Sequence, residues 1–422
     1  MPTHQTLPNT IALPLFMLLA ISSLSTKAMG AAWALLTITG LWGLWRTRQT
    51  ATSIATPSAA PWIKTWLITT AVAMALKTVP TLYWADPWAE RHGEIRLLLG
   101  AIAVWGLSRW KVLDALTTSR IADALSLSSA LGLVWVLAYG RGEVCTHPIP
   151  WAVSVAMVSG WLMSKGLSND AQRPQRQRWL LGGLLAMLAV LASQSRGAFG
   201  IVLWWGAALL HQAWQQRQHA RLHRRLLMQT WLAATVLIGT VWALSYTAVL
   251  QRPMQSLHDA VEQITASRQS AEAGSNSSVG SRLYMWQKSQ VAISESPWIG
   301  HGHDGRKQAL ASWAAQANSH EVSRLGHLHN EFLNQLMDHG LWGLASQLAY
   351  IVGLVLVVRQ LLQAQQKTAA MAIGCVCFMH LSSSMSNVNF AHNYYTTALS
   401  MMVMLSLWMA QDGHKKRTAK VL

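Results

Sequence analysis

Long apolar stretches that carry almost no ionised side chains alternate with short charged segments along this sequence. Of its 422 residues, 52% are hydrophobic and only 12% are charged, whereas about a quarter of the residues in a soluble domain are charged. Because lipid offers no hydrogen-bond partners, each stretch must satisfy its backbone polar groups within a helix. The stretches are continuously apolar rather than alternating, which argues against a transmembrane β-barrel. The sequence therefore predicts an all-α polytopic membrane protein.

About twelve stretches are long and apolar enough to be read as membrane-spanning helices. They are residues 10–26, 28–45, 62–78, 96–110, 121–139, 149–165, 178–193, 197–214, 229–249, 337–358, 368–386 and 394–411. An even number of spans places both termini on one side of the membrane. The last span is followed by the basic segment 414–417, and basic loops stay in the cytoplasm. We therefore expect a multi-pass protein of a bacterial inner membrane with both termini cytoplasmic.

The formal net charge of +17 invites a nucleic-acid function, but the placement of the charges argues against one. Basic residues gather in every second loop, as around Arg46, Arg109, Arg173, Arg217 and Arg359. Cytoplasmic loops of membrane proteins retain Lys and Arg in this way. The charge is therefore a signal of topology, and we expect membrane lipids rather than nucleic acid as partners.

One segment outside the predicted spans, residues 250–336, is long enough to fold alone. It contains an amphipathic stretch at 282–293 and a turn-rich stretch at 296–305, but few large apolar residues. We expect it to pack on the spans as a lid on the periplasmic side. The chain is accordingly divided into spans 1–9 at residues 1–249, this periplasmic loop region, and spans 10–12 with a cytoplasmic tail at residues 337–422.

Two arginines are expected at the outer face of the membrane. Arg196 lies at a tight reversal between two predicted spans, and Arg282 begins the amphipathic stretch of the long loop. A guanidinium at the membrane edge needs an anion or must extend into water. Two arginines on the outer face would form a fork-shaped site for a diphosphate. The alternative is that each is an ordinary solvated residue.

His329 opens a helix that is predicted to descend into the bilayer. The ordinary pKa of an imidazole lies close to working pH, so a histidine at this outer rim suits a general base. The alternative is a structural histidine at a helix start. Two smaller polar patches in other outer loops either touch a sugar or are simply solvated: Asn387, Asn389, His392 and Asn393, and Arg141, Glu143 and His147.

Several other chemistries lack support in the sequence. The outer loops contain no Walker-type phosphate loop, nucleophile elbow or Asp-x-Asp pair. His301, His303 and His320 invite a zinc site, but their spacing matches no zinc signature. The predicted spans contain almost no carboxylates, which an ion-coupled transporter needs. We therefore expect no metal and no other cofactor, and a flippase or other transporter is the alternative outside the enzymes.

Three segments together resemble the O-antigen ligase and polymerase family of bacterial envelope glycan enzymes. The segments occur in the order that the family has and cover roughly residues 185–350. They are Ser195-Arg196-Gly197; Arg282-x-x-x-Trp286 followed by Pro297-x-x-Gly300-x-Gly302; and His329-Asn330-x-x-Leu333 followed by Gly340-Leu-Trp-Gly343.

The resemblance implies a helical fold related to the C-type membrane glycosyltransferases. It implies metal-independent, inverting transfer of O-antigen from undecaprenyl diphosphate to the lipid A–core on the periplasmic face. In such an enzyme Arg196 and Arg282 hold the diphosphate and offset charge on the leaving group. His329 takes the proton of the acceptor hydroxyl. The other motif residues expected to contact substrate are Ser195, Trp286 and Asn330.

Within the family, one long outer loop of moderate size favours a ligase. A polymerase of O-antigen or exopolysaccharide, or an enzyme that glycosylates proteins through oxygen, shares the same motifs and remains open. A purely structural role would require no donor binding at all.

Overall fold

The computed structural model describes residues 6–50, 60–87, 92–109, 118–168, 172–217 and 275–421, and every regular element in these ranges is a helix. The helices are α1 (Thr6–Ala20), α2 (Thr26–Thr50), α3 (Pro61–Tyr83), α4 (His92–Arg109), α5 (Thr118–Tyr139), η3 (Arg141–Glu143), α6 (Pro148–Leu167), α7 (Arg173–Ala192), η4 (Arg196–Ala198), α8 (Gly200–Arg217), α11 (Gly280–Glu295), α12 (Gly302–Gln316), α13 (His320–Ser323), α14 (Glu331–Gln363), α15 (Lys367–Ser384) and α16 (Asn393–Val421). For the described residues, the all-α prediction is confirmed.

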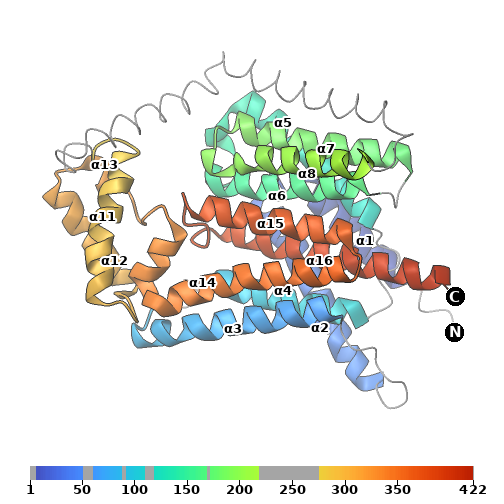
Figure 1. The fold of residues 1–422 in the computed structure, drawn as a ribbon, viewed down its shortest axis with the longest axis horizontal. Helices are drawn as coiled ribbons and strands as arrows, with labels where there is room; N and C mark the ends of the chain where they lie inside the picture. The colour runs from blue at the N-terminus through green and yellow to red at the C-terminus, as the bar shows by residue number, and fades with distance from the viewer. Residues whose placement is uncertain are drawn as a thin grey trace.

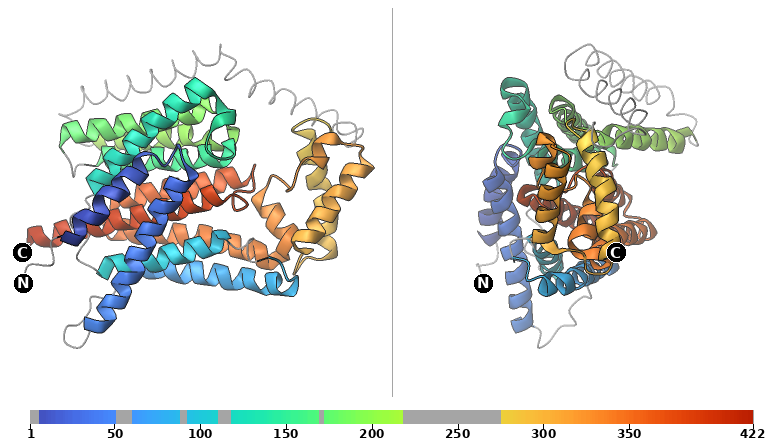
Figure 2. Two further views of the ribbon diagram at one scale, coloured as in Figure 1. Left: turned by 180° about the vertical axis from the view of Figure 1, so that it is seen from behind. Right: turned by 90° about the vertical axis from the view of Figure 1, so that its left-hand side faces the viewer.

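The long helices form one bundle, and the three helices α11, α12 and α13 lie together at one of its ends (Figure 1). In Figure 2, α1 begins and α16 ends at the opposite end. The core is centred on α6, which packs against α5, α7, α8, α15 and α16. Its side chains are almost all buried, including Trp151 and Trp161.

Eleven of the predicted spans coincide with helices, and the ninth, at residues 229–249, lies outside the described residues. Within the described ranges, four helices are long and apolar enough to cross a membrane: α2 over Thr26–Arg46, α3, α5 and α14. The other described helices do not meet both the length and the hydropathy of a span; α1, for example, contains a shorter apolar helix at Ile11–Ala20. Helices enclosed by other helices, such as α6, rely on small residues and hydrogen bonds between helices rather than on apolar surface. The number of spans stays a prediction.

Helix α14 begins six residues before the predicted span. Its N-cap is Asn330, whose Oδ1 accepts a hydrogen bond from the backbone N–H of Leu333 at 3.1 Å. An Asn cap satisfies a backbone donor that the first turn of a helix leaves without a partner. The helix therefore starts in the long outer loop and carries Glu331 and Asp338 into the bundle as buried side chains.

Buried carboxylates lie at the outer ends of these helices; Glu94 and Glu331 are outside the predicted spans, and Asp338 is just inside one. Helix α4 likewise starts earlier than predicted and buries Glu94, which pairs with Lys77 of α3 at 2.7 Å. Asp338 pairs with Arg306 of α12 at 2.5 Å. A buried charge is tolerated when it is paired and hydrogen-bonded. These carboxylates are partnered within the protein, so they do not by themselves indicate an ion pathway.

A kink divides α14 at Gly340, where φ is 61° and ψ is −150°. Leu341 N donates to the carbonyl oxygen of Pro297 at 2.8 Å, and His301 N donates to the carbonyl oxygen of Met337 at 2.8 Å. In an unbroken helix Leu341 N would instead donate to Met337 O. The backbone of segment 296–301 therefore replaces the lost helical hydrogen bond and holds α14 at its kink. We call this backbone contact between residues 296–301 and Gly340 the clasp.

The glycines of two sequence motifs permit this backbone contact. A Cβ atom at Gly340 would overlap the backbone of Trp298, and one at Gly300, where φ is 71°, would lie 2.6 Å from the carbonyl carbon of Asp338. The conformation of Gly340 is one that only glycine adopts readily. The two motifs therefore dock onto each other, and this explains their glycines without any contact to substrate.

We expect Gly340→Ala and Gly300→Ala to destabilise the protein. Backbone strain alone costs on the order of 1–3 kcal/mol, and the overlap with Trp298 or Asp338 adds to it. Both variants should lower the unfolding temperature in detergent. Gly206→Ala is the matched control, because a Cβ atom at this position of α8 meets no atom within 4 Å. Wild-type unfolding temperatures in the two clasp variants would contradict the role given to these glycines.

The helices α11, α12 and α13 share a small core with the start of α14. It consists of Tyr284, Met285, Leu310, Trp313, Ala314, Val322, Leu328 and Met337. The Tyr284 hydroxyl also donates to the carbonyl oxygen of Trp313 at 3.2 Å. The outer segment was expected to hold few large apolar residues, but those it has, together with Met337 of α14, are enough to form this core. Figure 2 shows α11 and α12 lying over the end of the bundle.

Candidate functional site

The two arginines of the sequence prediction lie close together. Arg196 is exposed in η4, which contacts α6 and α15, and Arg282 is half-buried in the first turn of α11. Burial lowers the pKa of Arg282, and the nearby charge of Arg196 lowers it further. Within the described part of the chain, neither guanidinium makes a hydrogen bond or an ion pair. Two like charges without a counter-ion make a site that attracts an anion.

His329 lies near Arg282 of this pair, whose charge acts on its imidazole. Its side chain is buried, at 8% exposure, and its Nδ1 atom has no hydrogen-bond partner in the described structure. Burial lowers its pKa to about 2, with further lowering by His327, Arg282, His147 and His392. The imidazole is therefore neutral in the empty site and has a free ring nitrogen. A neutral imidazole with an unpaired nitrogen is able to accept a proton.

The backbone around His329 is held from two sides. Trp286 of α11 donates from Nε1 to the carbonyl oxygen of Leu328 at 2.7 Å, and Leu328 N donates to Oδ1 of Asn334 at 3.3 Å. His329 itself has φ of 51°, in the left-handed region. A residue stays in that region only when its surroundings fix it. Trp286, which was expected to contact substrate, uses its polar atom to position the loop of His329.

Arg306 of α12 holds the same loop through a hydrogen bond and an ion pair. It donates to the carbonyl oxygen of Gly326 and pairs with Asp338, whose second oxygen accepts from Asn334 Nδ2 at 3.0 Å. Arg306 Nη2 also donates to Nδ1 of His303 at 2.9 Å. A fully partnered buried network of this kind rigidifies what it holds. Sequence reasoning could not find this network, because its members come from α12, the loop and α14.

A second buried pair ties this network to the end of α3. Asp86 accepts from His339 Nε2 at 2.9 Å and from the backbone N–H of His303 at 3.1 Å. Burial raises the pKa of Asp86, but these hydrogen bonds outweigh it and the net shift is downward.

Two of the histidines that invited a zinc site, His301 and His303, bond within the protein. His301 donates from Nε2 to the carbonyl oxygen of Ala292 at 2.7 Å. In the described residues, no three His, Cys, Asp or Glu side chains are placed to hold a metal ion.

The other two predicted substrate contacts, Ser195 and Asn330, also make bonds within the protein. Ser195 is buried, and its hydroxyl donates to the carbonyl oxygen of Pro148 at 3.1 Å, which ties the η4 turn to the start of α6. Asn330 donates from Nδ2 to the carbonyl oxygen of Met385 at 3.3 Å. Both residues position segments of the site, and their contact with substrate stays a prediction.

The loop between α15 and α16 completes the surroundings of His329. Glu331 is buried, and its carboxylate accepts from Phe390 N at 3.1 Å and from Gln335 Nε2 at 2.9 Å. This contact brings His392 next to His327, with ring centroids 6.3 Å apart. The sequence placed His392 in a separate polar patch, because nothing in a single sequence shows that two loops about sixty residues apart meet.

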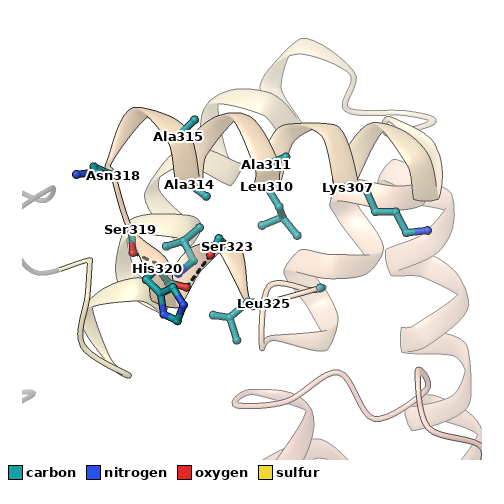
Figure 3. A pocket seen from close by; sticks show the side chains of 12 residues that line it. Lys307, Leu310, Ala311, Ala314, Ala315, Asn318, Ser319, His320, Ser323 and Leu325 are labelled. Atoms are coloured by element: carbon teal, nitrogen blue, oxygen red, sulfur yellow. Dashed lines mark hydrogen bonds between the residues drawn. The ribbon is translucent and has the colours of Figure 1, made fainter.

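A cavity of about 560 Å³ lies between α12 and α13. Figure 3 shows Leu310 and Leu325 on its apolar side, with Lys307, Asn318 and His320 around it. None of the six predicted site residues lines it. It borders the loop of His329 only through Leu325 and Gly326, so it is separate from the cluster of arginines and histidines.

Acid is expected to destabilise the folded protein through the histidines of the site. Burial lowers the pKa of His327 and of His392 to about 4 each, from an unfolded value of about 6.5. Below pH 6.5 the unfolded chain binds protons that the folded chain does not, so the free energy of unfolding falls between about pH 6.5 and pH 4. Above pH 6.5 this contribution is fully present.

The unfolding temperature, measured in detergent at a series of pH values, tests this expectation. It should decline less steeply toward acid in His392→Gln than in the wild type, because one of the responsible groups is gone. His320→Gln, outside the cluster, should decline as the wild type does. Identical slopes in all three proteins would contradict the assignment.

Comparison with known proteins points to one family. The family model described as O-antigen ligase matches residues 181–348, a range that contains Arg196, Arg282 and His329. An uncharacterized protein of Haemophilus influenzae is 28% identical over 133 residues, which are 30% of this chain and 30% of that protein. The alignment therefore spans less than a third of the length of this relative.

Proposed function

We infer that this chain is a member of the O-antigen ligase family, whose model matches residues 181–348, and we propose that it transfers O-antigen from undecaprenyl diphosphate to the lipid A–core. The reaction takes place on the periplasmic face of the inner membrane, without a metal ion and with inversion at the anomeric carbon. The observation that carries the proposal is the pair of guanidiniums without a counter-ion, Arg196 and Arg282, of which Arg282 lies near His329 with its unpaired nitrogen.

The two guanidiniums suit the diphosphate of the donor. A guanidinium presents several N–H groups in a fixed plane that matches phosphate oxygens, and it keeps its charge at every working pH. When the bond between the anomeric carbon and the diphosphate oxygen breaks, negative charge grows on that oxygen. Arg196 and Arg282 stabilise this charge, which is the part that a metal ion plays in other transferases.

His329 serves as the base. The acceptor hydroxyl attacks the anomeric carbon from the face opposite the diphosphate, so the configuration inverts. Its proton passes to the ring of His329, and undecaprenyl diphosphate leaves with the electron pair of the broken bond. In the empty site the pKa of His329 is about 2, which is low for a base. The negative charge of the bound donor raises this pKa, because it opposes the charge of Arg282.

The arrangement of the chain is consistent with a site at the outer surface of the membrane. The candidate site lies at the end of the bundle that carries α11, α12 and α13, and α16 ends at the other (Figure 1). Exposed aromatic side chains lie near the end of α3 and the clasp of α14. They are Tyr83, Trp84, Trp298 and Trp342. Tryptophan and tyrosine are enriched at both membrane–water interfaces, so these side chains support a position of this end of the bundle at a membrane surface, and we propose that it is the periplasmic one.

The test is reconstitution of the purified full-length protein with a polyprenyl-diphosphate-linked O-antigen and lipid A–core, in buffer that contains a metal chelator. Formation of the joined lipopolysaccharide supports the proposal. Failure to join them under conditions in which the protein is folded would overturn it. Translocation of the donor without any transfer would indicate a flippase.

The banding pattern of lipopolysaccharide from a deletion strain separates members of the family. Loss of a ligase leaves bare core and accumulates long lipid-linked chains. Loss of a polymerase leaves core capped with single repeat units. Loss of an enzyme that glycosylates proteins through oxygen leaves the lipopolysaccharide unchanged. Only the first pattern agrees with the reaction proposed here.

A further inference from the structure

Four histidines form a line from the buried candidate base to the surface. The ring centroids of His329 and His327 are 4.4 Å apart, and those of His327 and His392 are 6.3 Å apart. The line ends in His147, which stacks on His392 at 5.4 Å with an angle of 21° between the rings. His329 is buried, His327 and His392 are half-buried, and His147 is exposed. Exposure to water therefore increases along the line.

Ring nitrogens along this line are buried and have no partner in the described structure. They are Nδ1 of His329, Nδ1 of His327 and Nε2 of His392. Buried polar atoms of this kind usually bond to ordered water. The rings of His329 and His327 are in edge contact, with centroids 4.4 Å apart, so a water that links nitrogens of neighbouring rings lies beside the rings rather than between them. Such a bridging water makes one hydrogen bond to each ring. Each neutral imidazole accepts a proton on one nitrogen and donates from the other, so the line has the parts of a proton path.

The charge of Arg282 at the inner end and the rising exposure to water both favour movement of a proton outward. The groups that act on the four histidines from neighbouring elements are all basic: Arg282 of α11, Arg306 of α12, Arg141 of η3 and His92 of α4. His92 in turn faces Arg96, Glu94 and Lys77. A proton on His329 is next to Arg282, where no carboxylate in the described residues stabilises it. It gains favourable solvation with each step toward His147.

We propose that His327, His392 and His147 carry the proton that His329 takes from the acceptor hydroxyl out to the periplasmic solution. This inference rests on the proposed function. The acceptor O–H bond breaks as its oxygen bonds to the anomeric carbon, and the diphosphate leaves with the electron pair of its bond. The proton on His329 then moves through water to His327, to His392 and to His147, and each ring returns to its neutral form.

The competing route is direct transfer of the proton from His329 to the departing diphosphate. In that case the three outer histidines only shape the site. The two routes differ in one measurable property, because a broken proton path is bypassed by a small base that diffuses in from solution. Free imidazole is such a base, and it does not replace a residue whose role is to pack or to bind the donor.

The experiment measures turnover of His327→Gln, His392→Gln and His147→Gln with saturating donor and acceptor, with and without added imidazole. We expect kcat to fall on the order of 10-fold in His327→Gln and His392→Gln, less than the loss from removing a general base itself. His147→Gln should lose less, because water reaches His392 once that exposed ring is gone. Imidazole should restore most of the lost turnover, while the dissociation constant of the donor stays as in the wild type.

His320→Gln is the matched control, an exposed histidine of α13 outside the line, and it should turn over as the wild type does. Wild-type turnover in the His327 and His392 variants would overturn the proposal. So would a loss that imidazole does not restore, or one that comes with weaker donor binding. His147 is exposed, so its variant gives a result even if an inner variant fails to fold. Absence of transfer by the wild-type protein would instead refute the proposed function.

Discussion

Arg196→Ala and Arg282→Ala are each expected to lower kcat/KM for glycan transfer by at least about 100-fold, the usual loss when one group that stabilises developing charge is removed. The expectation follows from the position of these guanidiniums, which lie near each other and make no ion pair in the described structure. Steady-state transfer by the purified variants, with the dissociation constant of the donor measured separately, tests it.

Lysine at the same positions provides a second comparison. Arg282→Lys retains the charge but loses the planar set of N–H donors, so we expect activity between those of the wild type and Arg282→Ala. Arg324→Ala is the matched control, because Arg324 belongs to the same outer region but is exposed and only pairs with Glu321 at 3.6 Å. Near-normal transfer by Arg196→Ala or Arg282→Ala would remove that residue from the site.

The second large effect is expected at His329. His329→Asn should lower kcat by about 10²–10⁴-fold, the usual contribution of a general base, and should leave donor affinity close to that of the wild type. Asparagine is the suitable replacement because, among side chains other than glycine, it tolerates the left-handed backbone that His329 adopts. The variant therefore removes the base without adding backbone strain.

Turnover and donor binding are measured on the same preparations of His329→Asn, and its unfolding temperature reports whether it is folded. Trp286→Phe is an informative companion, because it removes the hydrogen bond to Leu328 that positions the loop but leaves the imidazole in place. We expect it to lose less activity than His329→Asn. A folded His329→Asn protein with wild-type kcat would exclude His329 as the base.

The motif residues fall into two groups that the sequence alone did not distinguish. Arg196, Arg282 and His329 have side-chain atoms without partners in the described structure, as expected of groups that meet a ligand. The polar atoms of Ser195, Trp286 and Asn330 are used within the protein. The glycines at 300 and 340 join two backbones. The motifs therefore contain two kinds of residue: those expected to contact a ligand, and those that hold the surrounding backbone in place.

The sequence by itself determined the helical class, the positions of most helices and the three residues expected to carry the chemistry. It could do so because apolar runs and isolated charges are local properties that lipid and water select directly. Helix starts were less accurate, since the Asn330 cap and the buried pair of Lys77 and Glu94 let α14 and α4 begin in polar sequence.

Only the tertiary structure decided what surrounds His329. The clasp at Gly340, the buried network of Arg306 and the line from His329 to His147 each join segments that are distant in the chain. Such contacts depend on how helices pack and where loops meet, and no periodicity or composition of one sequence encodes them locally. Residue types therefore predicted which side chains are candidates for chemistry, whereas their surroundings and the proposed path for the proton required the fold.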